Sequence, residues 1–139
     1  MRRGAIALAL ARTALGVAAL AWPSLIARPW VGQVSGPAAR VLGRALGGRD
    51  IALGLGALAA LAEIPPGRAG SSAGARSGAA AWVGAGALAD SLDVLGTAAA
   101  WDELPPAGRW LVAATAGGAA AAGGAAAWSL LSGKPADAA

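Results

Sequence analysis

Apolar residues fill four long stretches of the chain, and short segments rich in proline, glycine and arginine separate them. Each stretch is about as long as the roughly 20 residues that an α-helix needs to cross the apolar core of a bilayer. The pattern predicts an all-α protein, with four transmembrane helices in an antiparallel up-down bundle. The expected spans are about 4–27, 38–63, 79–101 and 107–131.

Tryptophan residues lie at or near the ends of the expected spans, where their amphipathic rings suit the membrane interface. Interfacial anchoring explains all six without an aromatic ligand cage: Trp22, Trp30, Trp82, Trp101, Trp110 and Trp128. Between the spans, residues 28–40 read as a polar turn region and residues 64–78 as a flexible loop. We expect a single domain over 1–133 and a disordered tail over 134–139.

The first stretch has a competing interpretation as a signal peptide. Ala19-Leu20-Ala21 resembles a small-residue cleavage site. Arg12, however, interrupts what would be the apolar core of a signal peptide, and the stretch is long. We therefore expect a retained helix.

Composition supports the membrane interpretation. Hydrophobic residues make up 57% of the chain and charged residues 13%, whereas a soluble domain carries about 25% charged residues. The net charge of +4 comes from arginines placed mostly between apolar segments, which suits anionic lipid headgroups better than nucleic acid. The lipid bilayer is the expected partner, and the Ala, Gly, Arg and Trp usage indicates a bacterial plasma membrane.

Cysteine and histidine are absent from the chain. Disulfides and thiolate metal sites are therefore excluded, and the commonest general base is missing. We expect no cofactor.

Five charged residues fall inside the expected spans, where each needs a partner because charges are costly in a bilayer. With a rise of about 1.5 Å per residue, the spans place them at depths that can be compared. Arg49 and Asp93 lie level at roughly 19 Å, Asp50 at roughly 18 Å, Asp90 at roughly 15 Å and Arg12 at roughly 10 Å. We expect Arg49 to face Asp93, and Arg12 to reach Asp90.

Helical spacing predicts which neighbours these charges meet. Asp90 and Asp93 are three residues apart and share a face, which Gly86 and Thr97 extend. Gly54, one turn after Asp50, is expected to let the third span approach the second. Asp50 is expected to bridge to Arg49 or to Thr97.

Three carboxylates against two guanidinium groups leave one carboxylate in surplus, protonated or shared. This network has three interpretations: ion pairs that fix the bundle, a proton or cation site in a transport path at Asp90 and Asp93, or a divalent metal on Asp90-x-x-Asp93 facing a lipid headgroup. The metal interpretation lacks further acidic ligands, and only Thr13, Ser91 and Thr97 are available to extend a polar path.

We therefore expect a non-enzymatic membrane protein, without catalytic or metal residues, that has an accessory or assembly role. Its expected partners are a second copy or another membrane protein. A small oligomeric transporter or channel is the alternative.

The chain also resembles a family of small, uncharacterised four-helix membrane proteins of actinobacteria. The resemblance rests on Gly47-Gly48-Arg49-Asp50 with Leu53-Gly54-x-Gly56, on Ala89-Asp90-x-x-Asp93, and on the turn Arg28-Pro29-Trp30. It covers roughly residues 5 to 130. The family implies a membrane bundle and offers no established activity to carry over.

Overall fold

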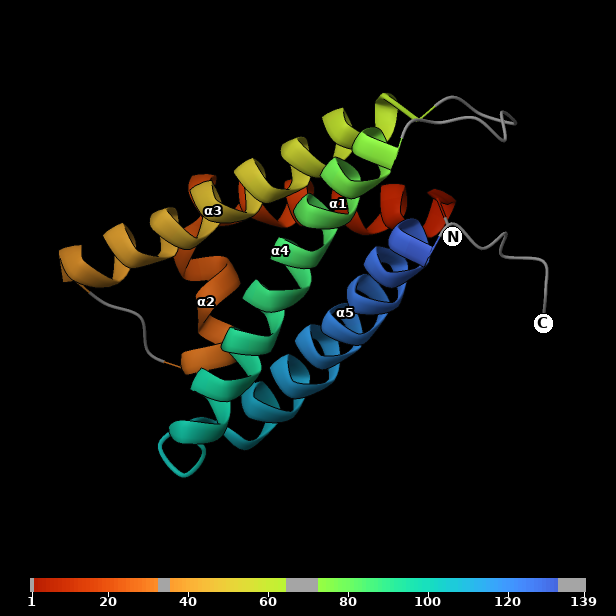
Figure 1. Ribbon diagram of the computed structural model, residues 1–139. Helices are drawn as coiled ribbons and strands as arrows, with labels where there is room; N and C mark the ends of the chain where they lie inside the picture. Colours follow the sequence, from red (N-terminus) through yellow and green to blue (C-terminus); the bar gives the residue numbers. More distant parts are fainter. Residues whose placement is uncertain (1, 33–35, 65–72, 133–139) are drawn as a thin grey trace.

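The computed structural model describes residues 2–32, 36–64 and 73–132, which form α-helices and no strand (Figure 1). The prediction of an all-α protein is therefore confirmed for the described part of the chain. The five helices are α1 (Arg2–Ala21), α2 (Pro23–Val31), α3 (Gly36–Ala62), α4 (Ala73–Ala99) and α5 (Pro106–Ser132).

The four long helices form two antiparallel hairpins, α1 with α3 and α4 with α5. The hairpins lie close together where α3 ends and α4 begins, and they diverge toward the other end (Figure 1). The short helix α2 lies in the wedge between them, against α1, α3 and α5. The described chain is thus two crossed hairpins with a fifth helix inserted, rather than the predicted four-helix bundle.

Glycines allow the close crossing of α1 and α3. A methyl group added at Gly16 would lie 2.6 Å from the carbonyl oxygen of Gly47, and one added at Gly54 would lie 2.8 Å from the carbonyl oxygen of Ala9. The expectation that Gly54 makes room for the third span is wrong, since Gly54 faces Ala9 and Thr13 of α1. Small residues at such positions let helix backbones approach closely in membranes.

The first expected span, 4–27, and the polar turn at 28–40 differ from the structure. The helix breaks at Trp22, whose φ of −130° and ψ of 65° are not helical, and Pro23 starts α2 in its first turn. Proline lacks the N–H that would continue α1 but is well suited to begin a new helix. Gly32, with a φ of +79°, closes α2 by donating its N–H to the Arg28 carbonyl at 3.0 Å.

The other expected spans lie close to α3, α4 and α5. The main difference is that α4 begins at Ala73, inside the stretch 64–78 that was expected to be a loop. Ala75 packs against the hydrophobic core, and Ala79 is fully buried, so tertiary packing extends the helix where Gly and Ser indicate a loop. The rest of that loop, 65–72, and the tail 134–139 lie outside the described residues.

Among the described helices, α1, α3 and α5 are long and apolar enough to cross a membrane. The helix α4 has the same length as α3 and α5, but Asp90 and Asp93 in its middle lower its hydropathy. It is also the most enclosed helix, because it lies between α3 and α5 (Figure 1) and buries more positions than any other. Large apolar side chains instead cover the outside of the molecule, including Leu10, Leu55, Leu88, Leu95 and Leu131.

Candidate functional site

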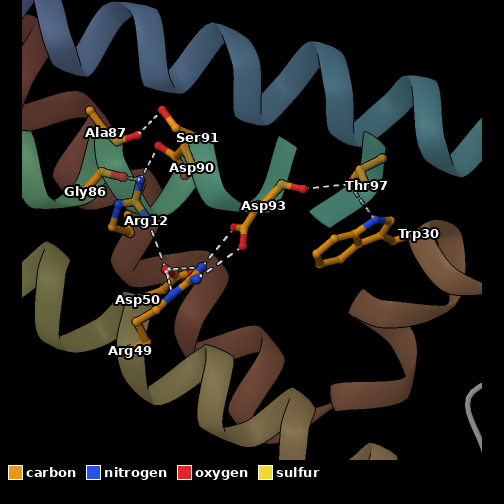
Figure 2. Close-up of polar contacts among 10 residues, drawn as sticks. All are labelled: Arg12, Trp30, Arg49, Asp50, Gly86, Ala87, Asp90, Ser91, Asp93 and Thr97. Atoms are coloured by element: carbon orange, nitrogen blue, oxygen red, sulfur yellow. Dashed lines mark hydrogen bonds and ion pairs between the residues drawn. The ribbon is translucent and has the colours of Figure 1, made fainter. Parts of the chain in front are cut away.

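The five charged residues singled out in the sequence come together where the two hairpins face each other (Figure 2). The first hairpin supplies Arg12 from α1 and Arg49 and Asp50 from α3, and the second supplies Asp90 and Asp93 from α4. We call these five residues the charge network. The first hairpin contributes a net charge of +1 and the second a net charge of −2.

Arg12 links both hairpins through its guanidinium group. Its Nη1 donates to Asp50 Oδ1 at 3.0 Å, and its Nη2 donates to Asp90 Oδ2 and to the Gly86 carbonyl oxygen, the latter at 3.1 Å. Gly86 has no side chain to hinder this approach, since a methyl group there would lie 3.2 Å from Arg12 Nε. At Gly86, on the face that Asp90 and Asp93 share, the nearest group is thus an arginine side chain rather than the backbone of another helix.

Arg49 makes the second link between the hairpins. Its Nη1 and Nη2 donate to Asp93 Oδ1 and Oδ2 at 3.2 and 2.9 Å, and Nη2 also donates to Asp50 Oδ1 at 3.2 Å. Two parallel hydrogen bonds between a guanidinium and a carboxylate form a strong and directional pair. The two cross-hairpin ion pairs, Arg12 with Asp90 and Arg49 with Asp93, are those that the depth estimate indicates.

Asp50 is the shared carboxylate. A single oxygen, Oδ1, accepts hydrogen bonds from both Arg12 and Arg49. The expected alternative contact with Thr97 is not made, because Thr97 lies further along α4 and is occupied by another partner (Figure 2).

The charged side chains of the network are less buried in this structure than their positions inside the expected spans predict. Side-chain exposure rises from 11% for Asp90, the most buried of the five, to 31% for Arg49. The partial exposure arises because the carboxylates border open space between the hairpins.

Trp30 is a part of the site that the sequence interpretation missed. Its indole Nε1 donates to Thr97 Oγ1 at 3.2 Å, and Thr97 in turn donates to the Asp93 carbonyl oxygen at 2.7 Å (Figure 2). Trp30 therefore ties α2 to α4, a contact that the interfacial role expected for it does not include. The sequence could have indicated such a contact, because the indole N–H of a tryptophan inside a bundle needs a hydrogen-bond acceptor.

Three other tryptophans also make contacts within the described part of the chain. The ring of Trp82 covers Gly56 of α3. Trp101 packs edge-to-face with Trp110 at 4.9 Å, and the guanidinium of Arg109 lies 4.8 Å from the Trp101 ring centroid. Trp22, Trp110 and Trp128 are 63%, 64% and 73% exposed, as interfacial anchors would be.

The hydroxyl groups near the network point back to their own helices. Thr13, Ser91 and Thr97 each donate to the carbonyl oxygen four residues earlier, at 2.9, 2.9 and 2.7 Å. Their donors are therefore used locally and do not line up as a path leading away from the carboxylates.

Two cavities border the carboxylates of Asp50 and Asp93, beside a smaller one of about 30 Å³ that is lined in part by Arg12 and Asp90. The larger of the two, of about 420 Å³, lies between α1, α2, α4 and α5 and is lined in part by Asp50, Asp90 and Asp93. The other, of about 130 Å³, lies between α1, α2 and α3 and is lined in part by Arg49, Asp50 and Asp93. Trp30 borders both.

The geometry does not favour the metal interpretation. Asp90 and Asp93 both accept hydrogen bonds from guanidinium groups. Across residues 2–32, 36–64 and 73–132, no group of three acidic, cysteine or histidine residues is arranged to hold a metal ion.

No protein-family model matches this chain, and neither the curated proteins nor the solved structures contain a match. The resemblance to an actinobacterial membrane family therefore stays a prediction. The charge network, with Trp30 and the cavities beside it, is the candidate functional site.

Proposed function

We propose that this chain is a small multi-pass integral membrane protein in which α1, α3, α4 and α5 all cross a bacterial plasma membrane. The apolar lengths of α1, α3 and α5 support this proposal. The helix α4 is as long as α3 and α5, and its two carboxylates meet guanidinium groups. An acidic helix can cross a membrane when its charges face the bundle interior and are paired there.

In this proposal the charge network holds the two hairpins together, and the protein has an accessory or assembly role without catalysis. The observation that carries it is that Arg12 and Arg49 of one hairpin each form an ion pair with an aspartate of the other. Hydrophobic burial provides little attraction between helices in lipid, so packing and polar contacts must hold the hairpins together. The bilayer is the proposed partner, together with a second copy or another membrane protein.

The four-span arrangement is tested by labelling single cysteines in the otherwise cysteine-free chain. Arg3→Cys, Glu63→Cys and Glu103→Cys place thiols at the start of α1, just after α3 and between α4 and α5, at exposed positions. A membrane-impermeant maleimide should label Arg3→Cys and Glu63→Cys from one side and Glu103→Cys from the other. Labelling of Glu63→Cys and Glu103→Cys from the same side would show that α4 does not cross the membrane.

One observation favours a second function, transport of a proton or cation at Asp90 and Asp93. The cavity of about 420 Å³ reaches both carboxylates, and acids within membranes often serve such paths. The test is proton flux into liposomes containing the protein, with Asp93→Asn as the variant and exposed Asp102→Asn as the control. Transport predicts flux that Asp93→Asn abolishes and Asp102→Asn retains, whereas the structural role predicts no flux above empty liposomes.

A further inference from the structure

We propose that the cavity of about 420 Å³ between α1, α2, α4 and α5 binds a small lipophilic cation, an organic ammonium ion with an apolar body. This inference deepens the second candidate function by naming a ligand class. It concerns binding, and it holds whether or not the ligand is moved across the membrane.

The first support is the size of the cavity. Small-molecule sites in proteins are mostly cavities of about 300–1,000 Å³, and this cavity falls in that range. It also opens to the outside of the bundle, because Leu25 of α2 and Leu111 of α5, which line it, are 67% and 50% exposed. These leucines lie on the apolar exterior, so a ligand can enter from the lipid side.

The second support is the separation of polar and apolar walls. The lining from α3 and α4 consists of three carboxylate residues, Asp50, Asp90 and Asp93. The lining from α1, α2 and α5 is apolar apart from Trp30 and Thr115. A ligand that fills this cavity therefore needs a polar group on one side and an apolar body on the other.

The third support is the sign of the charge. The guanidinium groups of Arg12 and Arg49 do not line this cavity, so a bound molecule meets the carboxylate side of the network. With three carboxylates and two guanidinium groups, the fully ionised network carries one uncompensated negative charge. The carboxylate side chains are only 11–22% exposed, so an opposite charge is attracted more strongly there than in bulk water. A monovalent cation balances that charge, whereas the phosphate of a zwitterionic lipid headgroup would be repelled.

The fourth support is Trp30, which borders the same cavity. The hydrogen bond to Thr97 holds its indole in place. Aromatic faces attract organic cations within about 6 Å of the ring centroid. An ammonium group that binds between the carboxylates and this ring is therefore attracted by both the carboxylates and the aromatic face.

The test uses the full chain in uncharged detergent micelles and equilibrium dialysis with radiolabelled benzyltrimethylammonium. Benzenesulfonate serves as the anionic counterpart and neopentylbenzene as the neutral one. Ala116→Trp fills the cavity without changing a charge, because Ala116 lines it, and Ala114→Trp adds the same side chain to the exposed face of α5 as a matched control. Thermal unfolding of both variants verifies that each is folded.

The proposal predicts saturable binding of about one cation per chain, with at least tenfold weaker binding to Ala116→Trp and unchanged binding to Ala114→Trp. Neither counterpart should show saturable binding. The proposal is overturned if the folded wild-type chain binds no cation saturably, if Ala116→Trp binds as well as the wild type, or if the neutral counterpart binds equally. Displacement of the cation by equimolar sodium would point to an inorganic cation site and would also overturn it. None of these outcomes changes the role of the network in joining the hairpins, which is measured without ligand.

Discussion

Arg49 and Asp93 lie 44 residues apart in the chain, yet their side chains meet through two parallel hydrogen bonds of 3.2 and 2.9 Å. They belong to α3 and α4, which come from different hairpins. Asp93 also connects, through its main-chain carbonyl, to Thr97 and from there to Trp30 of α2. One short stretch of α4 therefore makes polar contact with both α2 and α3.

The geometry of Arg12, and not only its charge, is expected to matter. Arg12→Lys keeps the positive charge, but an ammonium group cannot reproduce the planar fork that contacts Asp50, Asp90 and the Gly86 carbonyl. We expect a loss of about 2 kcal/mol in the free energy of unfolding, on the order of one or two hydrogen bonds to charged groups. Unfolding in detergent measures it, and exposed Arg40→Lys is the control, expected to change little. Equal stability of Arg12→Lys and the wild type would contradict the role given to the guanidinium.

The crossing of α1 and α3 is expected to reject even one methyl group at Gly54. Gly54→Ala would place that group 2.8 Å from the Ala9 carbonyl oxygen and against Thr13, and overpacking of this kind costs about 1–3 kcal/mol. Gly48→Ala on the same helix meets nothing within 4 Å. It should be neutral or slightly stabilising, because alanine favours helix over glycine. Thermal unfolding of the two variants in the same detergent makes the comparison, and a similar shift in both would contradict the close crossing.

Thr97 is expected to matter because it accepts the indole N–H of Trp30. Thr97→Val keeps the shape of the side chain but leaves Trp30 Nε1 without this acceptor, which should cost about 1–3 kcal/mol. Thr115→Val is the matched control, since the exposed Thr115 hydroxyl bonds only to the Leu111 carbonyl of its own helix. Near-ultraviolet circular dichroism should also change for Thr97→Val, as α2 loses its attachment to α4. An unchanged spectrum together with unchanged stability would show that the contact does not hold α2.

The sequence predicts the pairing of Arg49 with Asp93 because depth in a membrane helix follows residue number at a fixed rise. An error of a few residues at one span end moves only the depths on that helix, by about 1.5 Å per residue, so the relative level of two charges on different helices shifts by a few ångströms. The same reasoning identifies Arg12 as the partner of Asp90. Side chains as long as arginine tolerate the remaining error of position.

The sequence does not predict the rotation of a helix about its axis, and Gly54 shows the consequence. Glycine indicates a close approach but not which helix makes it, and α1 rather than α4 lies against Gly54. The break at Trp22 was missed for a related reason. A proline is equally compatible with a turn and with the first turn of a new helix, and only packing against α1, α3 and α5 selects the helix α2.

The start of α4 shows tertiary packing overriding local preference. Glycine and serine between residues 64 and 78 indicate a loop, but α4 already begins at Ala73. Tertiary packing also decides the contacts of Trp30 in the candidate site. Its position near an expected span end does not indicate that Thr97 accepts its indole N–H.

The central claim, that the charge network joins the two hairpins, is tested most directly by a double-mutant cycle on Arg49 and Asp93. Arg49→Met and Asp93→Asn each remove one charge while keeping most of the side-chain volume. Arg49→Met leaves the Asp93 carboxylate without its guanidinium partner, which is costly in a poorly solvated site. Asp93→Asn leaves Arg49 with Asp50 of its own helix as its carboxylate partner and removes the ion pair to the other hairpin. Asp93→Asn combined with Arg40→Met, an exposed arginine of α3, is the control pair and should give additive losses.

The measurement is the free energy of unfolding of the wild type, the two single variants and the double variant in one detergent. We predict that each single variant is destabilised and that the double variant recovers about 1–3 kcal/mol relative to the sum of the two losses, as directly interacting residues do. If the two losses simply add, as expected for the control pair, the ion pair does not couple the hairpins and the central claim is contradicted.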